Sequence, residues 1–167
     1  YSISVPTSDK TADFLSVPAM DMIMEDSIID SPLVEYTDEE YKYASQFNSM
    51  EYDLKDNIDA SYEKGKKSIQ IGSTDVADVS WIAPMGSITV TTMAKDSTMH
   101  GWSVVAQGKS SIAHKGMHRA AGILAQAALR VIESPELQKK IKEDFNKSKA
   151  GEEYGSLLPA NVKPGDF

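Results

Sequence analysis

Residues 115–132 form a long, mostly apolar stretch with the sequence KGMHRAAGILAQAALRVI. Its apolar residues recur three or four positions apart, which is the spacing of one face of an α-helix. They also extend around most of the helix, and a helix that is apolar nearly all round is typical of a core. We therefore expect a largely buried helix here, with core positions at Met117, Ala120, Ala121, Leu124, Ala128 and Val131.

A second helix is predicted directly after the first. Ser134 is a typical N-cap residue, and Pro135 suits the first helical position, where its missing N–H is not needed. Leu137, Ile141 and Phe145 then recur at helical spacing and form the expected buried stripe.

Short strands are predicted on the N-terminal side of the long helix. Residues 88–93 are rich in β-branched side chains, which favour strands, and residues 103–106 form a second candidate. Residues 68–71 form a third candidate, and a turn of small residues follows it. The pattern predicts an α/β fold in which short strands are flanked by helices.

The first part of the chain is strongly acidic. Residues 1–63 contain 15 acidic residues and 3 lysines, a balance of −12, whereas residues 64–167 carry a balance of +4. An acidic part of this kind is a solvated face, an insertion or a partner-binding surface. The overall charge of −8 argues against a protein that binds nucleic acid by neutralising phosphates.

Two helices are predicted in this acidic part. The first spans residues 18–30, with Pro18 in its first turn and apolar residues at helical spacing. Thr37 and Glu40 form a capping box, which predicts a second helix that ends near Asn48. Residues 51–67 are expected to be a loop or a weak helix.

Composition excludes several classes of site. The chain of 167 residues has the length of one domain and no cysteine, which excludes disulfides, thiolate metal sites, iron–sulfur clusters and a cysteine nucleophile. No apolar run approaches the roughly 20 residues that span a bilayer, and residues 1–10 do not resemble a signal peptide. We expect a soluble, cytoplasmic protein.

The three histidines are the first candidates for chemistry. His100 lies in a polar loop between two predicted strands, where a side chain is presented to a cleft. His114 and His118 are four residues apart, so they would share one helix face, but no glutamate lies between them as a His-Glu-x-x-His zinc site requires. The alternative is a structural position for both at the start of the long helix.

Asp75 and Asp78 follow a predicted strand and would point into a cleft, although Asp75 also suits a helix N-cap. The three protein ligands of a catalytic zinc site are not visible in the chain. It contains neither a Gly-rich phosphate loop nor a Gly-x-Ser-x-Gly elbow.

Three segments in order carry a family resemblance: GSTDVADVSW at 72–81, MHGW at 99–102 and AQGKSSIAHKGM at 106–117. Together they resemble the C-terminal part of the aminobenzoyl-glutamate utilisation protein B family, within the superfamily of zinc-dependent aminoacylases and carboxypeptidases. The acidic helix start at residues 35–40 also looks like that family.

The resemblance implies an amidohydrolase that cleaves the amide bond of an N-acyl amino acid such as p-aminobenzoyl-glutamate. It implies a catalytic α/β domain with a pair of divalent metal ions, zinc or manganese, and an inserted domain that forms a homodimer. On that pattern His100 is a late metal ligand, in an element that reads Met-His-Gly-Trp here and Gly-His-Ser-Trp in the family. The residues that would line the site are Ser73, Thr74, Asp75, Asp78, Trp102 and His114.

Family members are much longer than this chain. We therefore expect a C-terminal portion that lacks the general base and the other metal ligands, needs the N-terminal remainder of the enzyme, and is inactive alone. Its expected parts are an acidic, helix-containing segment at 1–67, a strand-loop-helix portion of the catalytic domain at 68–150, and an extended tail at 151–167. The alternatives are a non-catalytic α/β module that binds a partner or acts as a scaffold, and a small ligand-binding domain.

Overall fold

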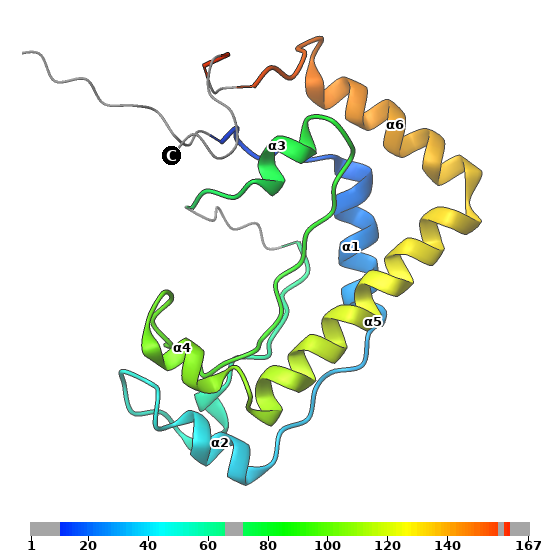
Figure 1. Cartoon of the computed structure of the whole chain (residues 1–167). Coiled ribbons are helices and arrows are strands. Elements are labelled where there is room, and N and C mark those ends of the chain that lie inside the picture. The colour runs from blue at the N-terminus through cyan, green and yellow to red at the C-terminus, as the bar shows by residue number, and fades with distance from the viewer. Residues whose placement is uncertain (1–10, 66–71, 157–158, 161–167) are drawn as a thin grey trace, which may run out of the picture. The chain divides into compact units, whose positions relative to one another are not determined.

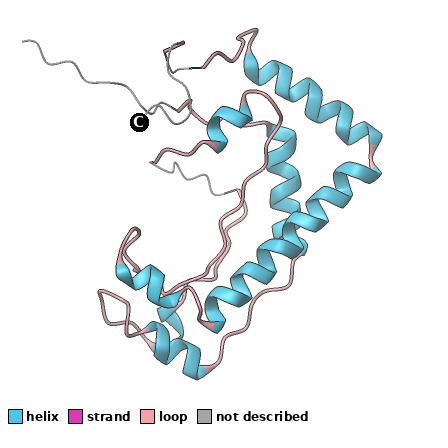
Figure 2. Cartoon of the chain, viewed as in Figure 1, coloured by secondary structure: helices cyan, strands magenta, loops and turns pink. Residues whose placement is uncertain are grey.

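The computed structural model describes residues 11–65, 72–156 and 159–160. Half of these residues are helical, and none of them is in a β-strand (Figures 1 and 2). The chain divides into two compact units, each built from separate stretches. Unit 1 comprises residues 1–22, 67–86 and 134–167, and unit 2 comprises residues 23–66 and 87–133.

The predicted α/β fold is wrong for the described residues. Residues 88–93 run as a non-helical segment without strand pairing, and residues 103–106 lie inside helix α4, Trp102–Gln107 (Figure 2). β-branched side chains favour an extended backbone, but a strand also needs a neighbour for its ladder of hydrogen bonds. The strand candidate at 68–71 lies outside the described residues.

The helix predictions for the acidic part are largely confirmed. Helix α1 is Pro18–Asp30, and helix α2 is Asp38–Ala44. The capping box is present in both directions, since Thr37 accepts from the Glu40 amide at 3.2 Å while the Glu40 carboxylate accepts from the Thr37 amide at 2.7 Å. Helix α2 ends before the predicted Asn48, and a short 3-10 helix, η1, follows at Leu54–Asn57.

The core of unit 2 is small and bordered by aromatic rings. Its buried members are Ala44, Ile58, Ala94 and Ile112, which come from four different segments. Four aromatic side chains pack against them: Tyr36, Tyr41, Tyr43 and Phe47. Tyr36 and Tyr41 form one edge-to-face contact, with ring centroids 5.9 Å apart, and Tyr43 and Phe47 form another, with centroids 5.0 Å apart.

Helix α5, Ser111–Glu133, contains the predicted long helix, but only one face of it is buried. The buried positions are Ile112, Gly116, Ile123 and Ala127. Met117 and Leu124 were expected in the core and are 55% and 48% exposed. The expectation of a largely buried helix is therefore wrong for the face that carries Met117 and Leu124.

Gly116 lets α5 approach residues 91 and 92 very closely. A Cβ atom at this position would lie 2.8 Å from Thr92 Cγ2 and closer still to the Thr91 carbonyl oxygen. The helix thus packs directly on the backbone of the non-helical segment.

Unit 1 contains helices α3, Val76–Ser80, and α6, Pro135–Lys149. The predicted start of α6 is confirmed, because Ser134 Oγ accepts from the Leu137 amide at 3.2 Å and Pro135 is the first helical residue. Ile141 is buried as expected. In the described part of the chain, no helix is both long and apolar enough to cross a membrane.

Candidate functional site

His100 lies in the turn that precedes α4 of unit 2. Its side chain is exposed, and its backbone φ of 60° places it in the left-handed region. Residues other than glycine are uncommon there, and histidine is among those found more often. Such strained positions cluster at functional sites, so the turn is a candidate for function on its geometry as well as on its motif.

Gln107 holds the two ends of the loop that presents His100. Its side chain is fully buried, and its Oε1 accepts from the Ala94 amide at 2.7 Å. Its Nε2 donates to Ser97 Oγ at 2.8 Å and to the Ser103 carbonyl oxygen at 3.0 Å. One amide group therefore ties residues on both sides of the His100 turn to the last residue of α4.

Asp96 anchors the start of the same loop. Its Oδ2 accepts from the Tyr52 hydroxyl at 2.5 Å and from Ser49 Oγ at 3.4 Å. The hydrogen bond from the Tyr52 hydroxyl to Asp96 favours the protonated phenol and raises the pKa of Tyr52. Lys95 Nζ lies 4.5 Å from the centre of the Tyr52 ring, so a second contact holds the same side chain.

Trp102 and His114 are the other predicted site residues of unit 2. Trp102 begins α4 and is 76% exposed, and one side of its ring contacts Phe47 with the centroids 6.0 Å apart. His114 is exposed on the first turn of α5, and His118 is exposed one turn later.

The remaining predicted site residues belong to unit 1. Ser73, Thr74 and Asp75 are exposed ahead of α3. Asp75 occupies the N-cap position of that helix, as its alternative interpretation expected, but its side chain makes no capping hydrogen bond. Asp78 is engaged within its own unit, because its Oδ1 accepts from the Ala12 amide at 3.3 Å and from the Tyr154 hydroxyl at 3.0 Å. The predicted site residues thus belong to both units, with His100, Trp102 and His114 in unit 2 and the others in unit 1.

The described residues do not form a metal site by themselves. Nowhere in the ranges 11–65, 72–156 and 159–160 do three or more histidine, aspartate or glutamate side chains gather as a cation would require. A catalytic zinc site normally uses three protein ligands and a water. His100 would supply one exposed imidazole to such a site and no more.

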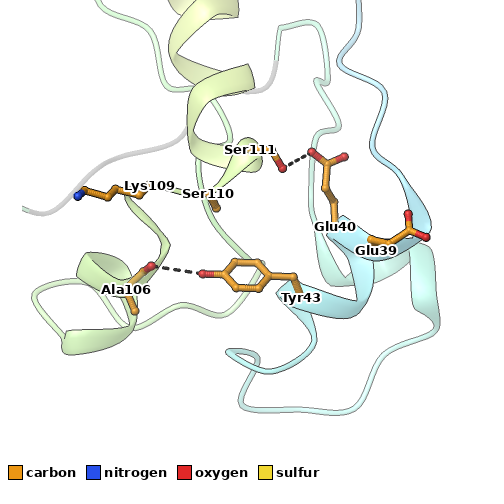
Figure 3. Close-up of a pocket in the computed structure, with 7 residues that line it drawn as sticks. All are labelled: Glu39, Glu40, Tyr43, Ala106, Lys109, Ser110 and Ser111. Carbon is orange, nitrogen blue, oxygen red and sulfur yellow. Dashed lines mark hydrogen bonds between the residues drawn. The ribbon is translucent and has the colours of Figure 1, made fainter.

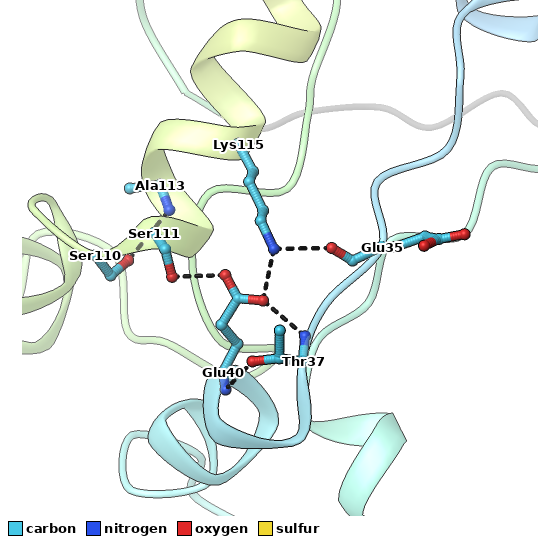
Figure 4. A network of polar contacts seen from close by, with 7 residues as sticks. All are labelled: Glu35, Thr37, Glu40, Ser110, Ser111, Ala113 and Lys115. Atoms are coloured by element: carbon cyan, nitrogen blue, oxygen red, sulfur yellow. Dashed lines mark hydrogen bonds and ion pairs between the residues drawn. The ribbon is translucent and has the colours of Figure 1, made fainter.

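Glu40 and Lys115 form a polar cluster of several hydrogen bonds in unit 2 (Figure 4). Glu40 Oε2 accepts from Lys115 Nζ and from the Thr37 amide, each at 2.7 Å, and Oε1 accepts from Ser111 Oγ at 2.5 Å. Lys115 Nζ also donates to the Glu35 carbonyl oxygen at 2.9 Å. The cluster joins the start of α2 to the first turn of α5.

The electrostatics of this cluster favour the ionised carboxylate. Burial of Glu40, which is 8% exposed, opposes ionisation, but hydrogen bonds from Lys115, Ser111 and the Thr37 amide outweigh it and lower its pKa. Burial raises the pKa of the neighbouring Tyr36, whose hydroxyl has no hydrogen-bond partner in the described structure. Glu40 is therefore a structural anion with its oxygens occupied, and not a candidate general base.

A pocket of about 400 Å³ opens beside this cluster (Figure 3). The Tyr43 hydroxyl bridges it by donating to the Ala106 carbonyl oxygen at 3.3 Å. None of the predicted site residues lines it. Its lining residues are Glu39, Glu40, Tyr43, Ala106, Lys109, Ser110 and Ser111.

Sequence reasoning missed the roles of Gln107 and Lys115, and it missed the contacts that Glu40 makes beyond its predicted capping box. All three lie in segments that were quoted for the resemblance or the capping box, but most of their partners lie between 10 and 80 residues away along the chain. A glutamine in an otherwise small and apolar helix was the one local signal for a buried, fully bonded side chain.

Comparison with known proteins confirms the resemblance over part of the chain. The chain is 32% identical over 97 residues to a protein of Escherichia coli (strain K12) that is one of the subunits of p-aminobenzoyl-glutamate hydrolase. The match covers 58% of this chain and 20% of that protein, so the match spans about one fifth of its relative's length. No family model matches the chain. No solved structure matches it either.

Proposed function

We propose that this chain is the C-terminal portion of a metal-dependent amidohydrolase that cleaves the amide bond of an N-acyl amino acid such as p-aminobenzoyl-glutamate. The similarity to a subunit of p-aminobenzoyl-glutamate hydrolase carries the proposal. The exposed His100, held in a left-handed turn, supports it independently because the motif residue is presented outward and not packed in the core.

His100 is proposed as one ligand of a site that binds two divalent ions, zinc or manganese. Such ions polarise an amide carbonyl and lower the pKa of a bound water when they are present. The other ligands and the general base are proposed to come from polypeptide outside this chain, as the resemblance implies. In the described residues, three or more potential metal ligands do not gather in one place. Trp102 and His114 would line the site from unit 2.

Residues of unit 1 have a supporting part in the proposal. Ser73, Thr74 and Asp75 are exposed and would line the substrate side, whereas Asp78 would shape the segment through its contacts with Ala12 and Tyr154. The complete enzyme is proposed to be a cytoplasmic homodimer, and this chain alone to be inactive.

The test combines the full chain with the part of the E. coli hydrolase subunit that lies outside the match. Release of p-aminobenzoate from p-aminobenzoyl-glutamate is measured with added zinc or manganese. We expect activity in the mixture and not in either part alone. His100→Ala should lower the activity at least about 100-fold, since even residues behind a metal ligand cost 10- to 100-fold.

His118→Ala is the matched control, because His118 is an exposed histidine of the same unit with no proposed role. It should leave the rate unchanged. Full activity in His100→Ala contradicts the assignment of that residue. A mixture that forms a stable complex but never hydrolyses the substrate favours the non-catalytic, partner-binding alternative.

A further inference from the structure

We propose that the outer face of α5 is a docking surface for the polypeptide that completes this hydrolase. The surface consists of Met117, Ala121, Leu124 and Ala128, which we call the outer stripe. The inference rests on the proposed function for the identity of the partner, but its evidence is the helix itself.

The outer stripe is apolar and exposed. Met117 is 55% and Leu124 48% exposed, and both alanines are exposed as well. The stripe lies on a different face of α5 from Ile112, Gly116, Ile123 and Ala127, which are buried. A helix at a protein surface normally has one apolar stripe and an opposite polar face, whereas α5 has two apolar stripes.

Charged residues are nearly missing from this part of α5. Between positions 116 and 129 the only formally charged residue is Arg119. Depletion of charge distinguishes the core of an interface from the rest of a protein surface. The helix has the composition of an element covered on two sides, and in the described part of the chain the outer stripe is exposed.

The spacing of the outer stripe indicates what kind of element covers it. Its members follow one another at intervals of four, three and four residues, which is the spacing of a helix-packing seam. The two alanines alternate with Met117 and Leu124, so a partner backbone can approach between the larger side chains. We infer that the docking element is an α-helix.

The partner follows from the length of the relative. The matched region accounts for 20% of the E. coli hydrolase subunit, so four fifths of that protein is polypeptide for which this chain has no counterpart in the match. A chain that completes a protein of that size has to bury a surface against it. The outer stripe is an apolar helix face of the described structure suited to that contact.

The absence of cysteine from the chain permits a direct test. Leu124→Cys places a single thiol on the outer stripe, and His118→Cys places one on another exposed face of α5. The rate of thiol labelling is measured for the full chain alone and after mixing with the part of the E. coli subunit outside the match. We expect at least about tenfold slower labelling of Leu124→Cys in the mixture and little change for His118→Cys.

A second pair of variants tests binding without labelling. Leu124→Lys and Leu129→Lys change residues that are 48% and 54% exposed on different faces of α5. Leu124→Lys should weaken the complex at least about tenfold in sedimentation experiments, because a lysine in an interface core is buried without a partner. Leu129→Lys should bind as the unchanged chain does.

Three results would overturn the proposal. The first is a Leu124→Cys thiol that is already protected in the chain alone. The second is protection that increases with the concentration of this chain, which would indicate that a second copy covers the outer stripe, and the third is a mixture that forms no complex. The two proposals fail separately. A complex that protects the outer stripe but hydrolyses nothing removes the proposed function alone, whereas hydrolysis with a freely reactive Leu124→Cys thiol removes the docking surface alone.

Discussion

The contact between Gly116 and residues 91–92 makes a quantitative prediction for Gly116→Ala. In a helix interior, replacing glycine by alanine gains about 1 kcal/mol of stability, because alanine restricts the unfolded backbone and favours the helix. At Gly116 the added methyl would meet Thr92 Cγ2 at 2.8 Å and the Thr91 carbonyl oxygen at a shorter distance. A backbone atom cannot rotate away, so the cost should be near the upper end of overpacking, about 3 kcal/mol.

Gly116→Ala is therefore expected to destabilise unit 2 by a net amount of about 2 kcal/mol. Gly122→Ala is the matched control, because Gly122 lies in the same helix and a Cβ atom there would meet nothing within 4 Å. It should gain about 1 kcal/mol. The two alanine variants should thus differ by about 3 kcal/mol although their sequences differ only in the position of one methyl group.

Urea unfolding followed by helical circular dichroism measures this difference. The midpoints should move in opposite directions, with similar slopes if the surface exposed on unfolding is unchanged. If Gly116→Ala stabilised the protein as much as Gly122→Ala does, the close approach of α5 to residues 91–92 would be refuted. The core arrangement around Ala94 and Ile112 would then have to be abandoned as well.

Further predictions concern Glu40 and His100. Glu40→Gln should lower the free energy of unfolding by about 1–3 kcal/mol, because the buried acceptor of Lys115 and Ser111 loses its charge. Glu39→Gln, at an exposed position of the same helix, should change it much less. The pKa of Glu40 is lowered in the folded state. Its contribution to stability is therefore present above the ordinary glutamate pKa, which is near 4.3, and is lost as the pH falls through the pKa of the folded state. Unfolding curves between about pH 6 and pH 3 should show a weaker pH dependence for Glu40→Gln than for the unchanged chain. His100→Gly should raise the unfolding free energy by about 0.5–1 kcal/mol, because relief of roughly 1–2 kcal/mol of left-handed strain exceeds the greater freedom of glycine in the unfolded chain. If this variant unfolds at a lower temperature than the unchanged chain, the His100 side chain has a structural role.

The helices of this chain could be predicted where the signals are local. The capping box at Thr37 and the Ser134-Pro135 start depend on atoms within four residues of one another, and both are present as predicted. The strand predictions at 88–93 and 103–106 failed because strand formation depends on a pairing partner, which the composition of the segment does not reveal.

The same distinction holds at the candidate site. The exposed position of His100 could be predicted from the polar loop around it. The role of Gln107 could not be predicted in this way. Its side chain forms hydrogen bonds with Ala94, Ser97 and Ser103, and these contacts can be inferred only when α4 is recognised as a helix. The residues 103–106 were assigned to a strand, and this error concealed the group that holds the His100 turn.

The structure also assigns different roles to residues in the segments that carry the resemblance. Gln107 is buried in hydrogen bonds, Ser111 and Lys115 hold Glu40, and Gly116 permits the close approach of α5. These residues have structural roles in the described fold, so their presence is not by itself evidence for hydrolysis. His100 is different, because it is exposed and occupies a backbone conformation that glycine would adopt at lower cost. A histidine that occupies such a conformation at the expense of stability is what a functional imidazole predicts, so position 100 adds geometric support to the proposal that the similarity carries.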